Sequence, residues 1–136
     1  MTALTPPLPR LTPESDFYWT SGATGTLSLL RCSACGFYLH PPTPQCRACG
    51  SADVAPQPVS GRATLFTFTV SYQQLLPSIP APYVVGIVAL EEQDDVHITT
   101  RIVGVDLDEV RIGMPLQVRF EQHDDVYLPL FAPVPA

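Results

Sequence analysis

The four cysteines of the chain stand in two short pairs within residues 31–50, RCSACGFYLHPPTPQCRACG. Their spacing is C-x2-C-x10-C-x2-C, and a glycine directly follows each pair. A two-residue gap lets both sulfurs of one tight turn reach the same ion, and glycine tolerates the left-handed backbone that such a turn often needs. Two such turns present four thiolates in a tetrahedron, as Zn²⁺ requires in structural sites. The pattern predicts a zinc ribbon with Cys32, Cys35, Cys46 and Cys49 as ligands.

Three other uses of four thiols have to be compared with this interpretation. Two disulfides would need an oxidising compartment, and a redox-active C-x2-C normally lies in a βαβ unit that the sequence does not suggest. An iron electron-transfer site uses the same four thiolates, so a rubredoxin-like electron carrier stays open as an alternative. Four cysteine ligands leave no open coordination position, and the predicted role of the zinc is therefore structural.

The charge of the chain disfavours two classes of partner. The formal net charge is −6, and the basic residues are seven arginines and no lysine. Proteins that bind nucleic acids or anionic membranes draw affinity from clustered basic side chains, so neither partner is expected, although a nucleic-acid-binding ribbon module is kept as an alternative. The first sixteen residues contain no apolar run like that of a signal peptide, and no stretch is long enough to span a membrane. A cytoplasmic location is expected.

Alternating and continuous apolar runs after Pro58 predict five strands. The runs are residues 61–72, 82–92, 96–104, 115–122 and 127–132. In the first run, Phe66, Phe68, Val70 and Tyr72 share one face, which we expect to be buried. Gly86 predicts a bend or bulge in the second run, and Pro129 predicts that the last strand lies at an edge.

Two short helices are expected outside these strands. Residues 11–22 would form the first, with Thr12 as its cap, and residues 105–115 the second, with Asp106 as its cap and Glu109 completing the capping pattern. Five strands with a helix between the third and fourth is the order of an OB-fold barrel. The expected fold is mainly β: an N-terminal arm with helix and lead-in strand (1–30), a zinc ribbon (31–58) and an OB-fold (59–136).

The sequence shows no catalytic constellation. His40, His97 and His123 lie in different predicted elements, and no nucleophile, phosphate-binding or dinucleotide motif is present. We therefore expect a protein that is not an enzyme by itself.

The order of the motifs resembles the DUF35 family, which joins a rubredoxin-like zinc ribbon to an OB-fold. The resemblance covers residues 12–131. It is carried by the following segments: FYW (17–19), LRCSACG (30–36), CRACGS (46–51), SGRATLFTFTV (60–70), PYVVGIVALEE (82–92) and RIVGVDLDEVRIGMPLQVRFEQ (101–122).

The resemblance implies an accessory role in acyl-CoA metabolism. Family members are similar in associating with thiolase-superfamily proteins or with MaoC-type enoyl-CoA hydratases, and some help to hold an acyl-CoA. The four cysteines match the zinc ligands of the family, whereas no shared catalytic residue carries over. The expected partner is a thiolase-like or enoyl-CoA hydratase-like protein, with acyl-CoA as a possible ligand.

Two further sets of residues are candidates for binding. Arg62 and Arg101 are nominated for contact with the phosphates of an acyl-CoA, since guanidinium groups recognise phosphate well. Leu75, Leu76 and Ile79 lie in a proline-broken loop between two predicted strands, where apolar side chains suggest a surface for a partner.

Overall fold

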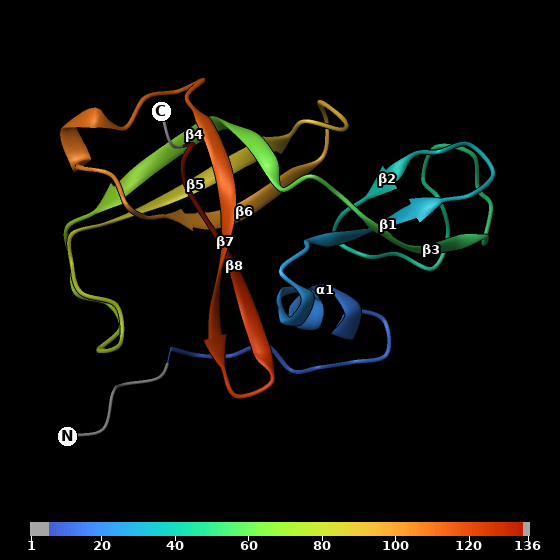
Figure 1. Ribbon diagram of the computed structural model, residues 1–136, viewed down its shortest axis with the longest axis horizontal. Coiled ribbons are helices and arrows are strands. Elements are labelled where there is room, and N and C mark those ends of the chain that lie inside the picture. Colours follow the sequence, from blue (N-terminus) through green and yellow to red (C-terminus); the bar gives the residue numbers. More distant parts are fainter. Residues whose placement is uncertain (1–5, 135–136) are drawn as a thin grey trace.

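The computed structural model describes residues 6–134 and contains a small three-stranded sheet beside a closed five-stranded barrel. Figure 1 shows α1 (Asp16–Thr20) close to both parts. The expected mainly β fold, with a zinc ribbon followed by an OB-fold barrel, is confirmed. Residues 1–5 of the expected N-terminal arm and residues 135–136 of the expected OB-fold lie outside the described residues. Within the described part of the chain, no helix is long and apolar enough to cross a membrane.

The N-terminal helix is shorter than the sequence suggests. A turn precedes it, in which the Thr12 carbonyl accepts hydrogen bonds from the backbone N–H groups of Ser15 and Asp16 at 3.1 and 2.8 Å. The Thr12 hydroxyl lies 2.8 Å from the Ser15 hydroxyl, so Thr12 does not cap a helix over 11–22. Only after this turn does α1 begin, and it continues into the 3-10 turn η1 (Ser21–Thr24).

Glycine at position 22 lets η1 approach the barrel closely. A Cβ atom at Gly22 would lie 2.5 Å from Cβ of Tyr127 and 2.6 Å from Cδ1 of Phe120. Any larger residue would push η1 away from the last two strands. The following Gly25 has φ +72°, which ends the turn, and the chain then enters the first strand.

The ribbon sheet has strand order β2-β1-β3. Its strands are β1 (Ser28–Cys32), β2 (Tyr38–Leu39) and β3 (Val54–Pro58), and both neighbours run antiparallel to β1. The ribbon buries a small core of its own, made by Leu30, Cys32, Leu39 and Cys46. So small a core cannot offset the entropy of ordering this segment, which therefore needs another source of stability.

The barrel closes in the order β4-β5-β6-β8-β7. The strands are β4 (Arg62–Ser71), β5 (Tyr83–Leu90), β6 (His97–Ile102), β7 (Pro115–His123) and β8 (Val126–Pro133). Leu65, Val88, Ile98, Leu116 and Phe131 are at most 1% exposed and fill the interior. The barrel thus has a much larger core than the ribbon.

A bulge in β4 overturns the expected inward face of this strand. Leu65 pairs with Val88 and Thr67 with Ile87, so Phe66 has no partner in the ladder. This extra residue shifts the alternation: Leu65 enters the core, whereas Phe66 is 54% exposed. Tyr72, beyond the end of β4, is 75% exposed rather than buried. Of the expected face, Phe68 and Val70 alone pack against the core.

The expected bulge at Gly86 and the expected edge position of Pro129 are not found. Gly86 keeps regular pairing with Phe68 and Thr100, and its missing side chain leaves room for Leu65 and Ile102. Pro129 does not mark an edge, because β8 lies between β7 and β6. Proline is tolerated there because β8 bridges to β6 through Phe131 and Ile102, away from Pro129. The Pro129 carbonyl accepts a hydrogen bond from the Thr100 hydroxyl at 2.9 Å.

The expected helix over 105–115 is a single 3-10 turn, η2 (Leu107–Glu109), between β6 and β7. The Asp106 side chain makes no capping hydrogen bond, so the capping pattern does not nucleate a helix. The 3-10 turn nevertheless lies between the third and fourth barrel strands along the chain, where the short helix was expected.

Side chains of the β5–β6 turn join the barrel to the ribbon. The Gln93 amide accepts a hydrogen bond from the Tyr38 N–H at 2.9 Å and donates one to the Tyr38 carbonyl at 3.1 Å. Arg47 stacks over Phe37 at 4.8 Å and lies 3.5 Å from Asp95. Gln93 therefore pairs with β2 much as another strand would, and fixes the ribbon against the barrel.

Candidate metal centre and surface pockets

The four cysteine sulfurs lie together at one end of the ribbon, all within 4.8 Å of one another. The Sγ atoms of Cys32 and Cys49 are 3.6 Å apart, as are those of Cys35 and Cys46. A tetrahedron with Zn–S bonds of about 2.3 Å has sulfurs about 3.8 Å apart, so the cluster has the size that zinc requires. The sulfurs are too distant for disulfides, whose S–S bond is about 2.05 Å.

The two cysteine turns repeat the same backbone geometry. In the first, the Gly36 N–H donates to the Cys32 carbonyl at 2.8 Å; in the second, the Gly50 N–H donates to the Cys46 carbonyl at 2.8 Å. Gly36 and Gly50 have φ of +80° and +79°, the left-handed conformation that the sequence suggested. The two halves of the motif thus fold alike because they carry the same residues at the same spacing.

Backbone N–H groups also point at the sulfurs. The Ala48 N–H donates to Sγ of Cys46 at 3.3 Å. The backbone N–H of Cys35 lowers the pKa of the Cys32 thiol, although burial opposes this shift. Hydrogen bonds of this kind stabilise the thiolate, which is the form that binds a metal.

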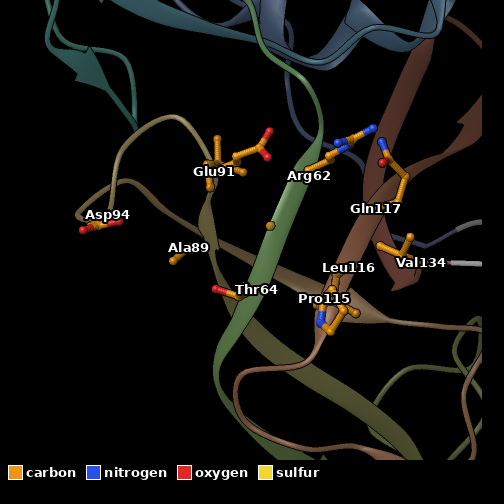
Figure 2. Close-up of a pocket in the computed structure, with 11 residues that line it drawn as sticks. Arg62, Thr64, Ala89, Glu91, Asp94, Pro115, Leu116, Gln117 and Val134 are labelled. Atoms are coloured by element: carbon orange, nitrogen blue, oxygen red, sulfur yellow. The ribbon is translucent and has the colours of Figure 1, made fainter.

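Arg62 lines an open pocket of about 540 Å³ at the start of β4. Figure 2 shows Arg62 extending toward Gln117 of β7, whereas Glu91 and Asp94 lie on the other side of β4. Among residues 6–134, no carboxylate lies within ion-pair distance of Arg62. Among the described residues, the pocket is thus lined by one cation without an ion pair, Arg62, and by two acidic side chains.

Arg101 lies at a different place, so the structure does not bring the two nominated arginines together. It lines a groove of about 350 Å³ and pairs with Glu121 at 3.2 Å. Leu76 and Ile79 of the 72–82 loop line the same groove, while Leu75 is 60% exposed. The apolar loop is therefore on the surface, as expected, and forms one wall of a mostly apolar groove.

Comparison with known proteins agrees with this two-part architecture. A family model described as "ChsH2, rubredoxin-like zinc ribbon domain" matches residues 19–55, and one described as "ChsH2, C-terminal OB-fold domain" matches residues 56–121. A solved structure called "Ltp2-ChsH2(DUF35) aldolase" contains a chain that is 30% identical, with a TM-score of 0.83. That match covers 93% of this chain and 98% of the other. The chain belongs to the DUF35 family.

Two curated relatives of this DUF35 chain carry hydratase names. It is 31% identical over 93% of its length to a probable enoyl-CoA hydratase alpha subunit of Thermomonospora curvata. It is 30% identical over 86% of its length to the 3-oxo-4,17-pregnadiene-20-carboxyl-CoA hydratase alpha subunit of Mycobacterium tuberculosis. The matches span 40% and 37% of those proteins. A DUF35 protein of unknown function from Sulfolobus solfataricus shares the fold at 12% identity, covering 90% of this chain and 86% of that one, with a TM-score of 0.61.

A third pocket of the DUF35 chain brings together two histidines that the sequence analysis placed in different elements. His40 and His97, expected to be isolated from each other, line the same pocket of about 400 Å³ together with Tyr18, Trp19 and Thr99. His123 lies elsewhere, 2.8 Å from Glu121. No local signal could have shown this grouping, because the residues come from three separate segments of the chain.

His40 should make the stability of the protein depend on pH. Burial lowers the pKa of His40 from 6.5 to about 4 in the folded protein. The pKa of such a histidine is lower in the folded protein than in the unfolded chain. Its contribution to folding stability is therefore complete above about pH 6.5 and is lost as the pH falls toward 4. At pH 5 this histidine should lower the free energy of unfolding by about 2 kcal/mol.

The measurement is urea denaturation of the wild type and His40→Phe at pH 7 and pH 5. Because the variant cannot titrate at this position, its free energy of unfolding should fall by about 2 kcal/mol less than that of the wild type. Effects of acid on the cysteine cluster are common to both proteins and cancel. Equal losses in the two proteins would show that His40 is not buried in its neutral form.

Proposed function

We propose that this chain is a non-catalytic subunit, which binds a thiolase-like or enoyl-CoA hydratase-like partner and supports acyl-CoA binding or transfer. The observation that carries the proposal is the match along 98% of the DUF35 chain in the Ltp2-ChsH2 aldolase. That name joins a DUF35 chain to a second protein, and the curated relatives are named as subunits of CoA-ester hydratases. The absence of a nucleophile and base motif in the sequence agrees with an accessory role.

The four cysteines are proposed to bind one structural Zn²⁺. The support is the size of the sulfur cluster and the N–H groups directed at the sulfurs. Such a site contributes about 10–16 kcal/mol of apparent binding free energy, which is large compared with burial in so small a ribbon. We also propose that the ribbon ends at Pro58 and the OB-fold begins after it, since β3 pairs with β1 and β4 belongs to the barrel.

The partner is proposed to contact the 72–82 loop. Leu75 and Tyr72 are 60% and 75% exposed, and Leu76 and Ile79 extend this apolar surface into the neighbouring groove. Exposed apolar side chains gathered on one loop are typical of surfaces that bind another protein. Figure 1 shows this loop leaving the barrel between β4 and β5, far from the cysteine end of the ribbon.

Arg62 is the arginine that we propose for contact with an acyl-CoA phosphate. It has no ion-pair partner among the described residues, whereas Arg101 is held by Glu121. Glu91 and Asp94 line the same pocket as Arg62 and oppose an anion there. Affinity of the isolated chain for acyl-CoA should therefore be weak, and the partner would supply the remaining phosphate contacts.

The test is co-purification of the tagged chain with candidate thiolase-like and MaoC-type hydratase proteins from the same genome, followed by titration of the purified pair. We expect a stoichiometric complex, and no turnover of acyl-CoA by this chain alone. Leu75→Glu should weaken the complex at least about tenfold, because binding would have to bury a charge in an apolar contact. Ile112→Glu is the matched control, since Ile112 is 67% exposed but lies near η2.

Three outcomes would contradict this proposal. Turnover by the isolated chain would disprove the non-catalytic role. Tight binding to RNA or DNA, together with no binding to either class of enzyme, would favour a nucleic-acid-binding module. Equal effects of the two glutamate substitutions would exclude the 72–82 loop as the contact surface.

A further inference from the structure

The pocket that contains His40 and His97 is built at the junction of three parts of the chain. The N-terminal helix region contributes Ser15, Tyr18 and Trp19, the ribbon contributes His40, Pro41 and Pro42, and β6 contributes His97 and Thr99. Its volume of about 400 Å³ lies within the range of small-molecule sites. It is separate from the cysteine cluster and from the pocket in Figure 2, and it shares one lining residue, Thr99, with the groove beside the 72–82 loop.

Of the described residues that line this pocket, none is acidic and none is lysine or arginine. His40 adds no charge at neutral pH, because burial lowers its pKa to about 4. A charged ligand would lose its hydration here without gaining an ion pair, which is unfavourable in a site with low polarity. The pocket therefore favours an uncharged ligand.

Aromatic rings form much of the wall. The Tyr18 ring lies 4.8 Å from the rings of both Trp19 and His40, and Tyr18 itself is 5% exposed. On the other side, His97 stacks on Phe66 with ring centres 4.5 Å apart and planes inclined by 27°. The bulge in β4 turns Phe66 outward, where it supports His97. Walls of this kind suit a flat group, which can stack or meet the rings edge to face.

The polar edge of His40 defines the hydrogen bond that a ligand could make. Its Nδ1 is buried and has no hydrogen-bond partner among the described residues. A buried N–H without an acceptor is rarer than an unsatisfied acceptor, so the neutral ring is expected to carry its proton on Nε2. Nε2, unlike Nδ1, is not a buried and unpartnered atom among the described residues, and we infer that it is the ring nitrogen that faces the pocket. A hydrogen-bond donor there calls for an acceptor on the ligand.

We propose that this pocket binds an uncharged, planar group bearing a carbonyl oxygen. The ring of the ligand lies among Trp19, Tyr18 and His97, and its oxygen accepts a hydrogen bond from Nε2 of His40. This inference concerns the isolated chain and goes beyond the proposed partner association. Failure of that association would leave the pocket and its test unaffected.

The test compares two probes of similar shape on the zinc-loaded full chain. Acetophenone is flat, uncharged and carries a carbonyl oxygen, whereas ethylbenzene has the same ring without an acceptor. Trp19 is the sole tryptophan of the chain, so its indole N–H signal in ¹⁵N NMR spectra reports directly on this pocket. Acetophenone is expected to bind at least about fivefold more tightly than ethylbenzene, the value of one net hydrogen bond.

His40→Phe should abolish or reverse this preference, so that the ethylbenzene-to-acetophenone ratio of dissociation constants falls to one or below, because the carbonyl would lose its hydration without a hydrogen bond in return. His123→Phe is the matched control: it removes an imidazole outside the pocket and should leave the ratio unchanged. If His40→Phe does not fold, nuclear Overhauser effects in the wild type decide the question. Contacts from the acetophenone methyl group to Trp19 and Tyr18, which line this pocket and not the groove beside the 72–82 loop, support the proposal. Equal binding of both probes, or contacts to another pocket instead, overturns it.

Discussion

Replacing Cys32 with serine is expected to release the metal and unfold the ribbon while the barrel keeps its strands. Cys32 ends β1, is 1% exposed, and belongs to the small ribbon core with Leu30 and Leu39. A serine hydroxyl stays protonated at neutral pH and is a poor zinc ligand. The ribbon would lose most of a contribution of about 10–16 kcal/mol, which its few buried side chains cannot replace.

The measurements are zinc content by mass spectrometry and thermal melting by circular dichroism. Zinc per chain should fall to near zero, and the first melting transition should fall by roughly 10 °C or more, since about 1 kcal/mol shifts Tm by several degrees in a small domain. Ser33→Ala is the matched control, because Ser33 is exposed and adjacent to Cys32. Full zinc content and unchanged melting in Cys32→Ser would disprove the structural role. Iron in place of zinc in the wild type would favour an electron carrier.

Truncating Phe131 to alanine should cost about 3–5 kcal/mol of folding free energy. Phe131 is fully buried, pairs with Ile102 in β6 and with Val118 in β7, and its carbonyl accepts a hydrogen bond from the Val103 N–H at 2.9 Å. The substitution would leave a cavity at the place where the barrel closes. Because small domains have only about 5–15 kcal/mol of stability, this change should bring the protein close to unfolding.

Phe66→Ala is the control for this experiment, since it deletes the same side chain from the outside of the barrel. Phe66 is 54% exposed and stacks on His97, so its loss should cost about 1 kcal/mol or less. Urea denaturation of both variants, with zinc bound, gives the comparison. If Phe66→Ala were the more damaging of the two, the bulge in β4 would be misplaced.

The strand content and the cysteine cluster could be predicted from the sequence because both depend on local patterns. Alternating and continuous apolar runs identified all five barrel strands, and the pairs of cysteines with their glycines identified both turns of the ribbon. The same reasoning failed for Phe66 and Tyr72, because one bulged residue reverses the inward and outward faces without changing the composition of the strand. It failed for Pro129 because β8 pairs with β6 only when the barrel closes.

For the candidate binding surfaces too, some features are visible in the sequence and others depend on tertiary structure. The apolar 72–82 loop is visible in the sequence, since its prolines and leucines lie within a few residues of one another. The separation of Arg62 from Arg101, and the ion pair that occupies Arg101, depend on strand order and register.

By itself, the sequence determined which segments form the barrel strands and where the four cysteines lie, because each of these is encoded in a short run of consecutive residues. The family resemblance comes from the order of several such segments along residues 12–131. The tertiary structure alone decided which side chains share a pocket. Tyr18, His40 and His97 meet because α1 packs beside β8, because Gly22 allows η1 close to Tyr127, and because Gln93 fixes the ribbon against the barrel. These contacts join segments that are far apart in the chain, and no local pattern specifies their geometry.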